Sequence, residues 1–359
     1  MTSAVQSRDY SLAGPENAQA VGAGLANAQW YQTPIPRKRM KELMKRSDGP
    51  ATRDTFIWLG SMVILAGLGV ATWGSWWCVP FFAAYGVLYG SAGDSRWHEC
   101  GHGTAFKTQW KNDVVYQIAS FFMMRNPVTW RWSHSRHHTD TIIVGRDPEI
   151  VVMRPPRLAK ILANFFGLVD VPQALMTMFR HAAGALSAEE RDYVPEAEAP
   201  KVYRVARIWL AIYAATAAAC VAMGSILPAM IIGLPRLYGA WHHVWTGLTQ
   251  HAGLAEDTLD HRLNSRTVDM NPISRFVYWN MNYHVEHHMF PMVPYHALPE
   301  LHQAMKADCP APYPSMWAAY KEIIPAIVGQ LRDPTHFVRR RLPPGATPFQ
   351  PEPATAAVA

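Results

Sequence analysis

Residues 55–93 read "TFIWLGSMVILAGLGVATWGSWWCVPFFAAYGVLYGSAG" and contain no Asp, Glu, Lys, Arg or His. A membrane core about 30 Å thick needs roughly 20 helical residues at about 1.5 Å per residue. These 39 residues are therefore enough for two spans. Gly, Pro and several tryptophans at 71–80 would form the turn, since tryptophan favours the membrane surface. We expect a helical hairpin in the membrane, and two buried helices of a soluble protein are the alternative.

A second charge-free run covers residues 208–235 and is broken by "MGSILP" at 223–228. With its flanking residues this run predicts a second hairpin. The four predicted spans are approximately residues 55–74, 76–94, 204–223 and 226–248. Arg236 then falls inside the fourth span, so either that boundary is wrong or the arginine faces the protein interior and pairs with an acid.

The basic residues lie on one side of the predicted spans. They occupy "PRKRMKELMKR" at 36–46 and the polar regions 94–207 and 249–342, whereas the turns at 71–80 and 223–228 carry no charge. Lys and Arg concentrate on the cytoplasmic side of membrane proteins. We therefore predict an integral membrane protein, of a bacterial inner membrane, with both termini and the large polar regions in the cytoplasm.

The organisation expected around these spans is one membrane domain between two tails. Residues 1–29 are predicted to be a mobile N-terminal tail, 30–342 the single domain, and 343–359 a disordered Pro/Ala-rich tail. The net charge of +6 is explained by the positive side of a membrane protein, and no nucleic-acid motif is present. The four scattered cysteines argue against a disulfide framework, a cysteine-ligated zinc site or a built-in rubredoxin.

Three histidine clusters stand out among the polar regions, all on the predicted cytoplasmic side. The histidines are His98 and His102, then His134, His137 and His138, then His284, His287 and His288. Spacings of three and four residues place the imidazoles of each cluster on one face of a helix. We interpret the three clusters as parts of one metal site.

The first cluster, His98-Glu99-Cys100-Gly101-His102, also matches the H-E-x-x-H motif of zinc proteases, with Glu99 as general base. A catalytic zinc takes three protein ligands, which would leave five or more histidines unexplained. Eight imidazoles suit two adjacent first-row metals instead, although imidazole accepts Fe, Cu, Ni or Zn and does not choose among them.

The stretches "HECGHGTAF", "HSRHH" and "NYHVEHHMFP" resemble the three histidine boxes of the membrane fatty-acid desaturase and hydroxylase superfamily. The resemblance covers roughly residues 54–310 and is greatest to acyl-lipid desaturases. It implies an all-α membrane protein in which four transmembrane helices in two hairpins hold a cytoplasmic helical cap with a diiron centre. It also implies that the eight box histidines bind iron, together with one further ligand near the end of the fourth span. His251 is chosen for that position, with His242 and His243 near the centre or at the membrane surface.

Carboxylates near the boxes could orient the ligands, because a ligating imidazole usually donates its other N–H to a carboxylate or carbonyl. The candidates are Asp94, Glu99, Asp140, Asp147 and Glu286. Glu99 is thus interpreted as an orienting group and not as a protease base. The remaining histidines are predicted to be surface or structural residues, namely His181, His261, His296 and His302.

The reaction that the resemblance implies is an O2-dependent desaturation of an acyl chain or a similar apolar substrate. Hydroxylation of a lipid or small hydrophobic molecule, a membrane zinc protease and a non-enzymatic metal-handling membrane protein are the alternatives. The sequence shows no cytochrome b5 signature, rubredoxin cysteines or G-x-G-x-x-G, so electrons are expected from a separate ferredoxin, rubredoxin or cytochrome b5 with its reductase. The basic stretches at 154–157 and 338–341 could bind that donor or anionic lipid. No substrate-binding residue is predicted.

Overall fold

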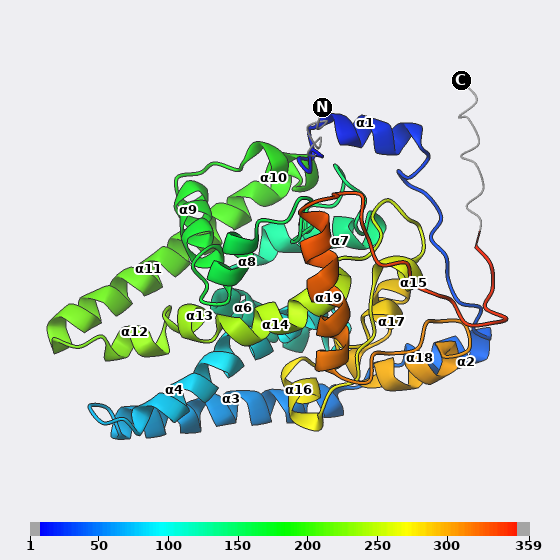
Figure 1. Cartoon of the computed structure of the whole chain (residues 1–359). Helices are drawn as coiled ribbons and strands as arrows, with labels where there is room; N and C mark the ends of the chain where they lie inside the picture. The colour runs from blue at the N-terminus through cyan, green and yellow to red at the C-terminus, as the bar shows by residue number, and fades with distance from the viewer. Residues whose placement is uncertain (1–7, 350–359) are drawn as a thin grey trace.

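The computed structural model of the chain describes residues 8–349 (Figure 1). These residues form helices joined by loops, and β-type pairing among them is limited to the isolated bridges Thr267–Tyr283 and Val268–Tyr313. The predicted all-α class is confirmed.

The first predicted hairpin is formed by α3 (Asp48–Ala71) and α4 (Cys78–Val87), which lie side by side at the lower left of Figure 1. The turn between them contains Gly74, whose φ of 88° suits glycine. Beyond α4 the chain continues through one π-helical turn, η1 (Leu88–Ala92), into α5 (Gly93–His102). The second predicted span therefore leads without a loop into the first histidine cluster.

Two helical stretches, Arg37–Ala71 and Glu196–Met223, are long and apolar enough to cross a membrane. One face of each packs inside the protein, as Trp58 and Trp209 do, but other large apolar side chains are exposed: Phe56, Val63 and Val221 are 75%, 72% and 83% exposed. Contiguous exposed apolar surface of this kind is rare on soluble monomers and typical of contact with lipid or a partner.

The second hairpin differs from the expectation. Its first arm is one long helix, α11 (Ala199–Met223), which ends at Gly224 with φ of 56°. Its return arm, expected as one span over 226–248, is three short helices: α12 (Leu227–Ile231), α13 (Pro235–Tyr238) and α14 (Ala240–His251). Prolines fit the first turns of α12 and α13 because they lack an N–H, and Gly233 with φ of 97° separates the two helices.

Arg236 lies in α13 and is buried, with 1% of its surface exposed. Its Nη1 donates to the carbonyl of Gly90 in the π turn at 3.2 Å. Of the two alternatives that the sequence left open, the arginine therefore fits the one in which it faces the protein interior. Its hydrogen bond, however, goes to a carbonyl and not to an acid.

The two hairpins meet at a pair of glycines. A Cβ built on Gly239, at the start of α14, would lie 2.0 Å from the carbonyl oxygen of Gly86 in α4. A Cβ on Gly86 would lie 2.4 Å from the ring of Tyr238. Only glycine at both positions allows this approach, which is how small residues act at the interfaces of membrane helices.

The remaining helices form the cap. It lies mainly at the right of Figure 1, with α9–α10 above α11. The helices of the cap are α6 (Gln109–Met123), α7 (Pro127–Thr139), α8 (Leu158–Asn164), α9 (Asp170–Ala182), α10 (Ala188–Tyr193), α15 (His261–Asn264), α16 (Pro272–Val277), α17 (His284–Met289), α18 (Leu298–Met305) and α19 (Met316–Gln330), with the short 3-10 turns η2 (Glu196–Glu198) and η3 (Tyr295–Ala297). The turns of both hairpins lie away from this cap, at the left of the same view.

Parts of both predicted tails contact the domain. Helix α1 (Pro15–Gly22) lies within 1–29, where Ala20 is buried and Arg8 forms an ion pair with Glu256 at 3.1 Å. Near the other end, the backbone N–H of Thr347 donates to Asp308 at 2.8 Å. These contacts join both segments to the rest of the protein, and their mobility stays a sequence-based prediction. Residues 1–7 and 350–359 of the predicted tails lie outside the described part.

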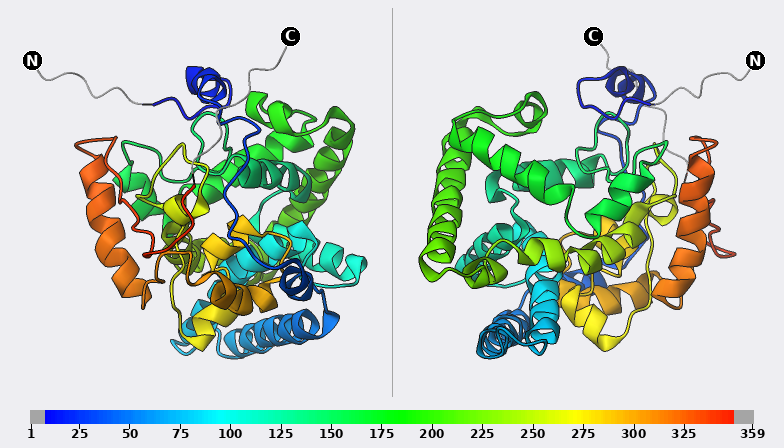
Figure 2. Two further views of the ribbon diagram at one scale, coloured as in Figure 1. Left: turned by 90° about the vertical axis from the view of Figure 1, so that its right-hand side faces the viewer. Right: turned by 60° about the vertical axis from the view of Figure 1, so that its left-hand side comes forward.

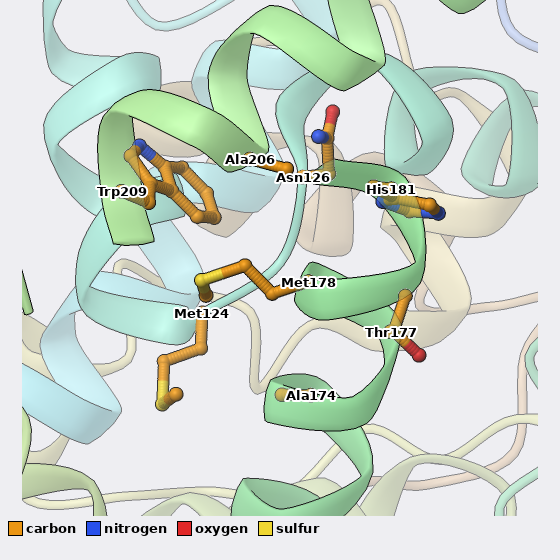
Figure 3. Close-up of a pocket in the computed structure, with 8 residues that line it drawn as sticks. All are labelled: Met124, Asn126, Ala174, Thr177, Met178, His181, Ala206 and Trp209. Carbon is orange, nitrogen blue, oxygen red and sulfur yellow. The ribbon is translucent and has the colours of Figure 1, made fainter. Parts of the chain in front are cut away.

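A small cavity lies between α9 and α11 (Figure 3). Met178 and Trp209 line it from the two helices, and Met124, Asn126 and His181 complete its polar and apolar walls. None of the clustered histidines lines it. We therefore do not assign the reaction to this cavity.

Candidate metal centre

The first cluster projects from α5, the helix that continues the first hairpin. His98 and His102 are one turn apart on this helix, which ends at Gly103 with φ of 69°. A Cβ on Gly101 would lie 2.4 Å from the ring of Trp130. The two glycines that weaken a helix by propensity thus have structural reasons: one ends α5 and the other admits the indole of α7.

The other histidines come from three further helices. Helix α7 starts at Asn126, whose side chain accepts from the backbone N–H of Val128, and carries the second cluster in its last turns. Helix α17 carries the third cluster, and His251 is the last residue of α14. Four helices from distant parts of the chain therefore converge on one place.

Five imidazoles form the first group, in which one nitrogen of each lies within 4.8 Å of the others: His98, His102, His134, His138 and His287. The Nε2 atom of His98 is 2.8 Å from that of His287 and 2.9 Å from that of His134. The Nε2 atom of His134 is also 3.1 Å from those of His102 and His138.

A second group of the same kind contains His137, His251 and His288. His284 adjoins this group, because its Nε2 atom is 2.9 Å from that of His251 and 3.0 Å from that of His288. The rings of His138 and His288 connect the groups, with centroids 4.5 Å apart. All nine histidines predicted as ligands thus lie together.

Several of the clustered histidines have a hydrogen-bond partner at Nδ1 in the surrounding protein, whereas Nδ1 of His138, His284 and His287 has none in the described part of the chain. Nδ1 of His134 donates to Glu149 and Nδ1 of His137 donates to Asp147, both at 2.8 Å. Nδ1 of His251 donates to the carbonyl of Asn264 at 2.8 Å. A proton fixed on Nδ1 leaves the lone pair on Nε2, which is the tautomer that binds a metal.

Electrostatics keep most of these rings neutral. Burial lowers the pKa of His134 and His287, and the neighbouring imidazoles lower it further. His137 is the exception: although burial lowers its pKa, the carboxylate of Asp147 raises it overall. A metal ion binds imidazole only in its unprotonated form. Most of these histidines are therefore in the form that a metal ion requires.

This donor set fits two metal ions. Several Nε2 lone pairs face one another at 2.8–3.1 Å, and such lone pairs repel unless a cation lies between them. Imidazoles without thiolates suit divalent first-row metals such as iron. The first group could hold one ion and the second group with His284 the other.

The predicted carboxylates behave differently from one another. Asp147 holds His137, as expected, and Glu99 lies 3.5 Å from Nδ1 of His287. Asp140 instead pairs with Arg146 at 3.1 Å, and Glu286 accepts from Thr267 at 2.6 Å and contacts His302. Neither of these last two touches a clustered histidine in these contacts, so orientation of a ligand by direct contact is not observed for them.

Glu99 is fully buried, and burial raises its pKa to about 8. Its Oε2 accepts from the hydroxyl of Thr104 and from the backbone N–H of Tyr295, both at 3.1 Å. A protease base must face the metal-bound water, whereas this carboxyl is enclosed behind His287. The geometry does not support the protease alternative.

Glu149 was not among the candidates, yet it holds His134. A signal for it is the stretch "DPE" at 147–149, which puts a second acid two residues after the candidate Asp147. His242 contacts Ser91 at 2.6 Å and His243 contacts Asp94 at 3.3 Å, and neither belongs to the two histidine groups. Three histidines set aside as surface or structural residues are buried: His181, His261 and His302.

Comparison with known proteins agrees with this geometry. A family model described as "fatty acid desaturase" matches residues 71–320. A "probable fatty acid desaturase" of Sorghum bicolor is 26% identical over 268 residues, which is 68% of this chain and 67% of that protein. The endoplasmic reticulum omega-3 desaturase of Nicotiana tabacum is 27% identical over 58% of this chain, and the omega-6 desaturase of Brassica juncea 26% over 58%. The chain spans 60% and 61% of the length of these last two relatives.

Proposed function

The chain belongs to the fatty acid desaturase family, and from this premise we propose that it inserts a double bond into an acyl chain or a similar apolar substrate. The observation that carries the proposal is the convergence of nine Nε2-bearing rings, several of them anchored through Nδ1. The reaction consumes one O2 and two electrons with two protons, removes two hydrogens from neighbouring carbons, and forms two waters.

We propose that the first histidine group holds one iron and that the second group with His284 holds the other. Two irons bound by imidazoles would supply O2 activation strong enough to break an unactivated C–H bond. Glu149 and Asp147 keep the protons of His134 and His137 on Nδ1 and so keep the Nε2 lone pairs available. The enclosing helices exclude water, since His134, His137 and His287 are at most 5% exposed.

The membrane arrangement follows from the two hairpins. We propose four crossings: α3, then α4 with η1, then α11, then the broken arm α12–α14. The termini and the metal centre then face the cytoplasm, because the basic segments lie at that end. The relatives named for the endoplasmic reticulum support a membrane location, and a bacterial inner membrane stays our sequence-based expectation.

We propose a separate donor protein of ferredoxin, rubredoxin or cytochrome b5 type as the source of electrons. The four cysteines include no C-x-x-C pair, and the two whose side chains are most enclosed, Cys100 and Cys309, are free thiols. A redox cofactor bound through cysteines within this chain therefore has no support.

The first test is metal content. We expect the purified full chain to hold about two irons, because nine imidazoles exceed the capacity of one ion. Metal analysis by plasma mass spectrometry checks this. His287→Ala should lower the iron content, whereas His296→Ala, outside both groups, should leave it near normal. One zinc and no iron in active protein would contradict the proposal.

The second test is the product. Lipids from cells with the wild-type chain should contain a double bond that is absent from cells with His287→Ala, as mass spectrometry after cleavage at the double bond would show. Growth under 18O2 separates the two outcomes of the same oxidant: desaturation leaves no label in the product, whereas hydroxylation introduces one 18O. A labelled alcohol would replace the desaturase assignment by the hydroxylase one.

A further inference from the structure

An extended segment between α1 and α2 (Arg37–Leu43) crosses the face of the cap near α15 and α17 (Figure 2). Its residue Trp30 is half-buried, and the indole stacks on the imidazole of His261 with centroids 4.3 Å apart and planes 5° from parallel. His261, the first residue of α15, is only 2% exposed. The indole therefore lies between solvent and a buried imidazole.

The same indole reaches both histidine groups. On one side, the ring of His261 lies 5.1 Å from that of His288, which belongs to the second group. On the other side, Nε1 of Trp30 donates to the carbonyl of Thr139 at 2.8 Å. Thr139 directly follows His138, a member of the first group. One partly exposed side chain is thus two short steps from each group.

Neighbouring contacts hold Trp30 in this place. The backbone N–H of Tyr31 donates to the carbonyl of Leu259 at 2.9 Å, and the guanidinium of Arg262 lies 3.5 Å from the centre of the Tyr31 ring. Arg262 is in turn paired with Asp260 at 2.8 Å. Tyr31 directly follows Trp30 and Arg262 directly follows His261, so their contact holds the two segments together beside the stack.

Much of the metal centre is enclosed, although His102, His138 and His251 are only partly buried. His134, His137, His284, His287 and His288 are at most 5% exposed. The rate of electron tunnelling falls steeply with the gap between donor and acceptor. A path through stacked rings and a hydrogen bond therefore carries electrons better than an empty gap of the same length.

We propose that Trp30 and His261 form the path by which electrons from the donor protein reach the metal centre. The inference rests on the proposed function. In each cycle two one-electron carriers are oxidised and the centre gains two electrons. Trp30 and His261 bridge the gap, and neither is oxidised or reduced overall. They act as positioning residues for electron transfer and not as metal ligands.

The test measures reduction of the iron-loaded full chain, without substrate, in a stopped-flow spectrometer. Reduced [2Fe–2S] ferredoxin and reduced cytochrome b5 are used in parallel arms, and dithionite serves as a small reductant that needs no docking surface. Trp30→Leu removes the ring and its N–H, Trp30→Phe keeps a ring for stacking, and His261→Leu interrupts the second step. Trp110→Leu is the matched control, since Trp110 is 63% exposed on α6 and contacts neither group in the described contacts.

We expect Trp30→Leu and His261→Leu to slow reduction by the protein donor by about ten-fold or more, with Trp30→Phe between them and the wild type. Reduction by dithionite, iron content and the Trp110→Leu rate should stay at wild-type values. Wild-type donor rates in Trp30→Leu would overturn the proposal, as would an equal slowing by dithionite, which indicates a structural role. Failure of both donors to reduce the wild type would overturn it too. Failure of the proposed function would appear separately, as absence of the unsaturated product from the wild-type chain.

Discussion

The carboxylates around the imidazoles decide which ring nitrogen is free to bind a metal. Asp147 and Glu149 are two residues apart in an irregular loop, where both can turn toward α7 and hold His137 and His134. Glu286 lies within α17, one residue before His287, so its side chain leaves the helix about 100° away from that imidazole and meets His302. Closeness in sequence therefore identified the right region but not the right partner.

Glu149→Gln tests this role of the carboxylates. The amide cannot accept the proton of His134 as strongly as a carboxylate, and loss of such a partner typically lowers metal affinity about 10–100-fold. We expect Glu149→Gln and Asp147→Asn to lose iron at chelator concentrations that leave the wild type loaded, as iron analysis after dialysis would measure. Glu286→Gln is the control and should keep its iron. Equal iron loss in all three variants would contradict the assignment.

Among the helices, the apolar runs predicted where the hairpins lie but not how they are interrupted. Hydropathy averages over a window, and it does not register the π turn at 88–92 or the breaks that divide 226–248 into three helices. Both irregularities lie where the hairpins touch: Arg236 reaches the carbonyl of Gly90, and Gly239 meets Gly86. The breaks depend on contacts between segments far apart in sequence, which no local pattern contains.

Gly239→Ala should separate the hairpins. The added methyl group would overlap the carbonyl of Gly86, and overpacking of this kind typically costs about 1–3 kcal/mol. We expect a lower midpoint of thermal unfolding for the detergent-solubilised protein. Gly67→Ala in α3 is the matched control, because nothing lies within 4 Å of the added Cβ, and its midpoint should be unchanged or slightly raised. Equal midpoints for the two variants would show that the contact is unimportant.

For the molecule as a whole, the charge pattern predicted that the turns of both hairpins lie on the same side. The uncharged turns of the two hairpins lie on one side and the histidine-bearing helices toward the other (Figure 1). The mutual arrangement of the three histidine boxes was predictable because their spacing is helical and their resemblance to known boxes is specific. The contacts that residues 8–29 make with the domain were not predictable, because they include ion pairs such as Arg8–Glu256 across 248 positions of sequence.

Cysteine labelling in intact cells tests the proposed crossing. In a background with Cys78 and Cys220 replaced by serine, Ser75→Cys and Ser225→Cys should react with a membrane-impermeant maleimide. Thr335→Cys, which is exposed at the cap end, should react only after the cells are permeabilised. The reverse pattern would place the metal centre outside the cell and refute the cytoplasmic assignment.

The origin of the nine histidines in four separate helices affects how the protein is made. Helix α5 leaves the ribosome early, whereas α17 appears only after both hairpins have been synthesised. The two histidine groups can therefore close only after α17 has been synthesised, so the full ligand set becomes available to iron late. In cells short of iron, the Nε2 lone pairs of the clustered histidines in newly made chains would face one another without a metal ion. Such chains would be degraded more readily by membrane quality-control proteases. We therefore expect iron supply to govern the abundance and lifetime of this protein, and not only its catalytic rate.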